Sequence, residues 1–249
     1  MLARPGGPSH TGGVGYATRE EAGRRLARSA GHLRDADPVV LALPRGGIPV
    51  ARELAAALDA PLDVLVVRKL GVPWHPELAM GAIAEGPGPG TAGESTTQDA
   101  VFRVLNDDVI RRGRIAPESV AAVERRELAE LARRADCLRA GRTRVPLEGR
   151  TAIVVDDGIA TGATAAVACL AARASGATRV VLAVPVASPD ALRRAGRTAD
   201  EVICPWTPVD TDSVGAAYDD FHQLGDDEAI LLLRNTGTSG TGKSDETIR

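Results

Sequence analysis

Residues Ile153 to Thr164 read IVVDDGIATGAT, and this stretch decides the fold. It starts as an apolar run, passes through the adjacent carboxylates Asp156 and Asp157, and continues as a turn of small residues. An alanine-rich segment follows it. An apolar run, a glycine-containing turn and a helix-forming segment in this order predict a buried strand that leads into a helix. The stretch therefore indicates one unit of an α/β fold.

The two carboxylates occupy the position where ligands bind in such folds, beyond the carboxyl end of a strand. Adjacent buried carboxylates are costly unless hydroxyl groups or a hydrated metal ion face them. The turn at 160–164 offers backbone N–H groups, hydroxyls and a helix N-terminus, which together suit a phosphate. A ribose 5-phosphate would satisfy both halves. The plainer alternative, a strand–helix turn with a capping aspartate, requires neither the second aspartate nor the two hydroxyls.

Short apolar runs alternate with helical segments on both sides of this stretch. Near-continuous apolar strands separated by helices indicate a parallel sheet covered on both faces. We therefore predict one Rossmann-like α/β domain with a helical insertion at 117–139, where apolar residues form a stripe among Glu and Arg. The predicted strands are 39–43, 64–67, 80–84, 152–155 and 180–186, and the other predicted helices are 48–58 and 164–175.

Polar segments rich in small residues mark the margins of this domain. Residues 1–15 and 235–249 can bury little apolar area, so we expect two disordered segments around a domain at 16–234. Residues 85–98, EGPGPGTAGESTTQ, predict a long surface loop. Residues 237–244, GTSGTGKS, match the spacing of the ATP-binding P-loop. No predicted strand leads into them, so we interpret this match as chance.

Composition excludes several other classes. The 249 residues are 44% hydrophobic and 25% charged, which excludes disorder of the whole chain. A net charge of -3 argues against binding of nucleic acid through a strong positive field. No apolar run reaches the roughly 18 residues of a membrane span. The cysteines, Cys137, Cys169 and Cys204, lack metal-ligand spacing, which predicts a cytoplasmic protein with reduced thiols and no structural zinc.

Three stretches together resemble one family. VVDDGIATGAT, at 154–164, resembles the phosphoribosyl-pyrophosphate (PRPP) binding signature of type I phosphoribosyltransferases. LPRGGIPVA, at 43–51, resembles the pyrophosphate loop of that family, and VVRKLGVPWHPELAMGAIAE, at 66–85, resembles its second strand and the loop that closes over PRPP. The resemblance covers roughly residues 16–233 and is closest to a bacterial group of predicted phosphoribosyltransferases. Gly158 departs from the branched aliphatic residue of many members, and we expect it to loosen the turn.

The resemblance implies the type I phosphoribosyltransferase fold with a small C-terminal hood. It implies transfer of the 5-phosphoribosyl group from PRPP to an unidentified acceptor, a nucleobase or related amine, with release of pyrophosphate. Asp156, Asp157, Arg68 and Lys69 are the implied catalytic residues. Mg²⁺ is the implied cofactor, carried mainly by PRPP and reaching Asp156 or Asp157 through water. The implied PRPP-binding residues are Arg45, Gly46, Gly47, Asp156, Asp157, Gly158, Ala160, Thr161, Gly162, Ala163 and Thr164.

Other functions and partners remain open at this stage. A PRPP-binding regulatory protein without turnover is the main alternative, although the acidic charge and the lack of a helix-turn-helix pattern disfavour it. PRPP synthesis would need a further ATP-binding half. We expect PRPP and a small acceptor as partners, no nucleic acid and no membrane, and a homodimer is compatible with the family. Aromatic residues could stack on an acceptor base or simply pack the domain: Tyr16, Trp74, Phe102, Trp206, Tyr218 and Phe221.

Overall fold

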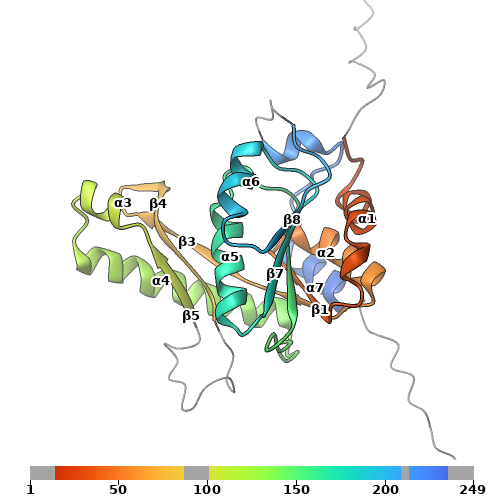
Figure 1. The fold of residues 1–249 in the computed structure, drawn as a ribbon. Coiled ribbons are helices and arrows are strands. Elements are labelled where there is room, and N and C mark those ends of the chain that lie inside the picture. Colours follow the sequence, from red (N-terminus) through yellow and green to blue (C-terminus); the bar gives the residue numbers. More distant parts are fainter. Residues whose placement is uncertain (1–14, 87–100, 209–212, 235–249) are drawn as a thin grey trace, which may run out of the picture.

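A five-stranded parallel sheet lies at the centre of the computed structural model, which describes residues 15–86, 101–208 and 213–234 (Figure 1). The strand order is β2-β1-β6-β7-β8. Every residue of β1 and β6 is buried, as expected for strands with helices on both faces. The strands are β1 (Pro38–Ala42), β2 (Leu62–Val64), β6 (Thr151–Val155), β7 (Arg179–Ala183) and β8 (Glu201–Ile203).

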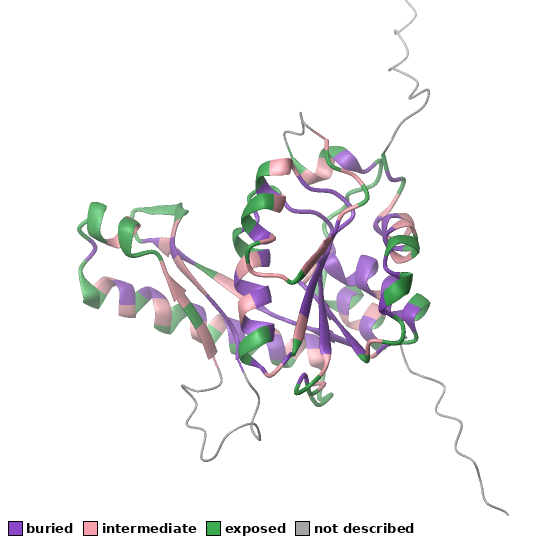
Figure 2. Cartoon of the chain, in the orientation of Figure 1, coloured by how far each residue is buried: buried purple, intermediate pink, exposed green. Residues whose placement is uncertain are grey.

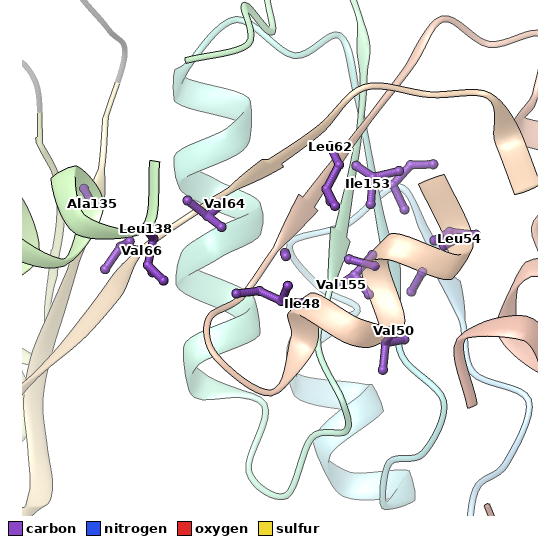
Figure 3. Close-up of a cluster of buried hydrophobic side chains, with 14 of the residues drawn as sticks. Ile48, Val50, Leu54, Leu62, Val64, Val66, Ala135, Leu138, Ile153 and Val155 are labelled. Atoms are coloured by element: carbon purple, nitrogen blue, oxygen red, sulfur yellow. The ribbon is translucent and has the colours of Figure 1, made fainter. Parts of the chain in front are cut away.

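Successive residues of these strands point to opposite faces of the sheet, where they join different apolar clusters. In β1, Val39 packs in the cluster that contains α5 and α6, whereas Val40 packs in the cluster that contains α2. Figure 3 shows part of the second cluster, with Ile48 of α2 and Val155 of β6. The first face is covered by α5 (Ala163–Ala174) and α6 (Pro189–Ala195), and the second by α1 (Arg19–Ser29), α2 (Gly47–Leu58) and α7 (Asp226–Arg234). The predicted α/β architecture is confirmed.

A second, antiparallel sheet forms a lobe beside the central sheet (Figure 1). Its strands are β3 (Val67–Val72), β4 (His75–Glu85) and β5 (Val101–Leu105), and the helices α3 (Asp107–Arg112) and α4 (Pro117–Arg139) follow them. The predicted helix at 117–139 is confirmed, but the insertion contains strands as well as helices. Only the two residues 73–74 separate β3 from β4, which permits a hairpin, whereas a parallel crossover needs about a dozen residues.

The assignment of two apolar runs to the parallel sheet was therefore wrong. The run at 64–67 divides between the end of β2 and the start of β3, and the run at 80–84 belongs to the antiparallel strand β4. The run at 180–186 stops being a strand at Ala183, and Val186 makes an isolated bridge to Trp206. Residues 87–98 of the predicted loop, and the predicted disordered segments at 1–14 and 235–249, lie outside the described residues.

One apolar cluster runs continuously from the central sheet into the lobe. It joins Ile153 and Val155 of β6 to Ile83 of β4 and Leu131 of α4. Figure 2 shows the resulting pattern, in which buried residues line the central strands and the inner side of α4 while its outer side is exposed. No helix within the described ranges is long and apolar enough to cross a membrane.

Candidate phosphate and ribose site

The predicted strand, turn and helix around the acidic pair are confirmed. Asp156 and Asp157 follow β6 directly, and α5 begins six residues after Asp157. Gly162, the residue before α5, has a φ of 79°, in the left-handed region that favours glycine. No side chain caps the α5 N-terminus, and Thr161 and Thr164 beside it are exposed. Uncapped amides and exposed hydroxyls at a helix N-terminus suit a phosphate group.

The surroundings of the two carboxylates disfavour their charged forms. Burial, and then the neighbouring charge of Asp157, raise the pKa of Asp156 well above its usual value. Burial also raises the pKa of Asp157, and the Arg19 guanidinium acts in the opposite direction. The backbone N–H of Asp157 donates to Asp156 Oδ1 over 2.9 Å, which orients the first carboxylate. A ligand that donates hydrogen bonds would relieve the cost of holding both charges here.

The predicted pyrophosphate loop lies directly against this acidic pair. Leu43 N–H donates to the carbonyl of Val155 over 2.8 Å, so the loop leaves β1 alongside the end of β6. A Cβ atom at Gly46 would collide with the Asp157 carboxylate, and one at Gly47 would lie 2.6 Å from the Val155 carbonyl oxygen. Glycine is therefore required at both positions for the loop to approach the carboxylates. The fold brings together two motifs that are more than 100 residues apart in the sequence.

Gly158 serves a packing purpose that differs from the expected loosening of the turn. A Cβ at this position would lie 2.5 Å from Val214 Cγ1 and 2.8 Å from Val186 Cγ1. The glycine is buried, and these two valines close over it. The space of the missing side chain is filled by Val186, which follows β7, and by Val214, which follows β8, so the glycine is needed for packing. That it loosens the turn stays a prediction.

The predicted cations each have a carboxylate partner in this structure. Arg45 in the loop pairs with Asp226 at the start of α7, over 3.1 Å. In the lobe, Arg68 pairs with Glu127 of α4, and Lys69 pairs with the exposed Glu77. Arg45 thus lies at the site, whereas Arg68 and Lys69 lie on β3. That Arg68 and Lys69 contact pyrophosphate stays a prediction.

Arg19 is a site residue that the sequence analysis missed. It lies at the first position of α1, and its Nε donates to Asp157 Oδ2 over 2.8 Å. The pair spans 138 residues of sequence. No motif surrounds Arg19, and the chain contains many arginines, so no signal in the sequence could have distinguished it.

The aromatic residues near the site pack on one another, which favours the packing interpretation over base stacking. The Tyr16 ring lies 5.5 Å from that of Tyr218 and 5.9 Å from that of Trp206, and Tyr16 and Tyr218 are buried. Tyr218 stacks on Phe221 at 5.2 Å. Trp74 lies apart from them, in the turn between β3 and β4, and is 65% exposed.

Comparisons with known proteins show what the whole chain resembles. No protein-family model matches the chain. Two curated Mycobacterium tuberculosis proteins are each 53% identical over 218 residues, which is 88% of this chain and 46% of each relative. They are named "Putative phosphoribosyl transferase MT0597" and "Putative phosphoribosyl transferase Rv0571c". Over these 218 residues the chain is therefore similar to proteins named as phosphoribosyl transferases.

The chain spans about half the length of the curated relatives it matches. The crystal structure of TT1426 from Thermus thermophilus is 37% identical, with a TM-score of 0.74, and the match covers 90% of this chain and 100% of that chain. The purine phosphoribosyltransferase of Pyrococcus horikoshii is more distant, at 17% identity and a TM-score of 0.39 over 76% of this chain and 82% of that chain. It therefore does not indicate the acceptor.

Proposed function

We propose that this protein transfers the 5-phosphoribosyl group of PRPP to a nitrogen of a nucleobase or related amine. The C1–oxygen bond to pyrophosphate breaks, pyrophosphate leaves with the bonding electrons, a C1–nitrogen bond forms and the acceptor nitrogen loses a proton. One observation carries the proposal: the acidic pair lies between a glycine loop and an uncapped helix N-terminus. These three features match the hydroxyls, the diphosphate and the 5-phosphate of a single ligand.

Different residues of the site would bind different parts of PRPP. Residues 160–164 would hold the 5-phosphate through backbone N–H groups and the two threonine hydroxyls. Asp156 and Asp157 would accept hydrogen bonds from the ribose hydroxyls, and Gly46 and Gly47 would let backbone amides approach the pyrophosphate. Arg45 would add positive charge after exchanging Asp226 for a phosphate oxygen. Positioning and charge stabilisation of this kind are the main contributions that a protein makes to such a displacement.

Mg²⁺ fits this site only as part of the substrate. Within the described ranges, no group of three or more His, Cys, Asp or Glu residues could hold a metal ion, and the acidic pair offers two carboxylates. Carboxylate oxygens suit Mg²⁺, which keeps several waters and binds substrate phosphates. Asp156 or Asp157 would hold one of those waters. The ion would supply positive charge to the departing pyrophosphate.

Binding of PRPP without turnover is a second candidate, and one observation favours it. Arg45, Arg68 and Lys69 are all paired with carboxylates, so the cations expected at the leaving group are engaged elsewhere in this conformation. A regulatory protein could retain the ribose and phosphate contacts while these pairs persist. Turnover requires at least that Arg45 leaves Asp226 and binds a pyrophosphate oxygen instead.

The two candidates differ in whether pyrophosphate is released. We expect PRPP with Mg²⁺ to raise the melting temperature of the protein, since a ligand that binds only the folded state stabilises it. A panel of purines, pyrimidines and small amines, followed by pyrophosphate release, then tests turnover. Release with one acceptor supports the transferase, and binding without release across the panel supports the sensor. The absence of PRPP binding would overturn both. The Thr161→Val variant should lose affinity for PRPP, whereas Thr178→Val, remote from the site, should not.

A further inference from the structure

Arg19 contacts the acidic pair through Asp157. Its Nε donates to Asp157 Oδ2, and its Nη1 donates to the carbonyl of His222 over 2.9 Å. The side chains of Arg19 and Asp157 are only 8% and 13% exposed, so water screens this ion pair little. Each of the two donors has a different acceptor. The guanidinium is therefore fixed in direction as well as in position.

The ring of Phe221 completes the surroundings of this guanidinium. Cζ, the central carbon of the Arg19 guanidinium, lies 3.8 Å from the centroid of the Phe221 ring, a distance typical of a cation–π contact. Phe221 stacks in turn on Tyr218, whose hydroxyl donates to the backbone carbonyl of Asp157. The aromatic stack thus supports the arginine and the aspartate together, which gives these rings a purpose beyond filling the core.

The segment that precedes α1 is tied to the segment that follows η2 (Val214–Ala217). The backbone N–H groups of Asp219 and Asp220 donate to the carbonyls of Tyr16 and Ala17, over 2.9 and 3.0 Å. Thr18 caps α1 immediately afterwards, since its hydroxyl accepts from the Glu21 backbone. The position of Arg19 is therefore fixed by the backbone contacts with residues 219–220 and by the start of α1.

We propose that Arg19 is a positioning residue, which fixes the Asp157 carboxylate so that Oδ1 faces the ribose hydroxyls of PRPP. This inference rests on the proposed function. The ion pair engages Oδ2, and a Cβ atom at Gly46 would collide with the same oxygen, so Oδ2 is enclosed by Arg19 and by the loop. Without the guanidinium, the carboxylate could rotate and would face Asp156 with no opposing charge. The 5-phosphate turn contacts neither Oδ1 nor Arg19, so the two halves of the ligand can be tested separately.

Calorimetric titrations with three ligands distinguish positioning from general damage. The ligands are PRPP with Mg²⁺, ribose 5-phosphate and inorganic phosphate. Arg19→Met keeps an unbranched side chain but removes the guanidinium that lies over Phe221 and its charge. We expect about 10-fold or greater loss of affinity for PRPP and ribose 5-phosphate. Inorganic phosphate should bind as it does to the parent protein. Arg19→Lys should recover part of the loss, and Arg28→Met, on the exposed side of α1, should change nothing.

The variant Asp157→Asn allows a double-mutant cycle with Arg19→Met. If Arg19 acts through this carboxylate, Arg19→Met should cause little further loss in the Asp157→Asn background. Equal loss for all three ligands, undiminished PRPP affinity, or a full additional loss in that background would overturn the inference. Should Arg19→Met not fold, Arg19→Lys in both backgrounds gives the same comparison, because a single ammonium nitrogen lacks the fork by which Nε and Nη1 of arginine reach separate acceptors. A parent protein that binds phosphate but not PRPP would overturn the proposed function itself, and this inference with it.

Discussion

At the scale of single residues, the two adjacent aspartates differ in their surroundings. Asp157 forms a buried ion pair with Arg19. The pKa of Asp156, by contrast, is raised by burial and then by the charge of Asp157. Replacement by asparagine should therefore change stability by different amounts at the two positions. Removal of a buried, unfavourable charge stabilises a protein, and removal of one member of a buried ion pair leaves the other uncompensated.

We expect Asp156→Asn to stabilise the unliganded protein at pH 8 and to have little effect near pH 4. The folded-state pKa of Asp156 is raised, so the native state binds its proton more tightly than the unfolded state. The stability of the parent therefore falls as pH rises from the unfolded pKa, about 3.9, to the folded one. Asparagine does not titrate, so its advantage should grow over that range. Urea unfolding at both pH values measures this, and a smaller PRPP-induced rise in melting temperature should accompany it.

The matched variant Asp157→Asn should stabilise the protein at pH 8 less than Asp156→Asn does, because it leaves Arg19 buried without its partner. Equal effects of the two variants on unfolding would contradict the different surroundings assigned to the two aspartates.

The Arg45–Asp226 pair predicts a variant with tighter binding. Both side chains are partly exposed, and such pairs contribute about 0.2–1 kcal/mol. Asp226→Asn frees Arg45 for a phosphate oxygen, so pyrophosphate and PRPP should bind up to about 5-fold more tightly. Asp227→Asn removes a neighbouring charge from the same helix and serves as the control. Calorimetry with pyrophosphate would disprove the competition if both variants gave the same affinity.

At the scale of elements, a buried ion cluster joins the lobe to the central sheet. Arg139, near the end of α4, pairs with Asp63 of β2 and with Glu85 at the end of β4. Its Nη2 also donates to the Val64 carbonyl over 2.7 Å. All three charged side chains are nearly inaccessible. One helix thus satisfies charges on strands of both sheets.

Arg139→Met should destabilise the protein by about 3–5 kcal/mol, because two buried carboxylates lose their cation. Arg134→Met removes an arginine from the same helix, where it pairs with Glu130 at the surface, and should cost no more than about 1 kcal/mol. Urea unfolding of the two variants gives the comparison. Similar losses would mean that the cluster contributes no more than a surface pair.

At the scale of the whole molecule, segments from both ends of the described chain meet at the ligand site. Arg19 comes from α1, and Asp226, the partner of Arg45, comes from α7. Leu233, near the end of α7, is 1% exposed and belongs to the cluster that joins both sheets. The described domain therefore depends on α7 as far as this residue.

Deletion of residues 235–249 should leave the melting temperature and the PRPP affinity unchanged, since Ala229 and Leu233 remain in place. Deletion from Asp226 onward removes these buried side chains and should cost several kcal/mol, since loss of one buried leucine alone costs about 2–5 kcal/mol. Thermal unfolding of the two truncations checks the difference. ATP hydrolysis by the full chain that disappears with residues 235–249 would instead support a P-loop at 237–244.

The sequence by itself determined the α/β class, the strand–turn–helix unit at the acidic pair, and the helix at 117–139. These features follow from local periodicity and from short motifs, which act over a few neighbouring residues. The family could be recognised for the same reason, because IVVDDGIATGAT is contiguous.

Only the tertiary structure decided which residues surround the acidic pair. Arg19 and Asp157 are 138 residues apart, and Gly46 is required by a carboxylate that enters from another strand. The separation of the apolar runs into two sheets was likewise decided by pairing partners, because a short apolar run has the same appearance in a parallel strand and in a hairpin. Contacts between distant segments depend on how the elements pack, and no local pattern encodes that packing.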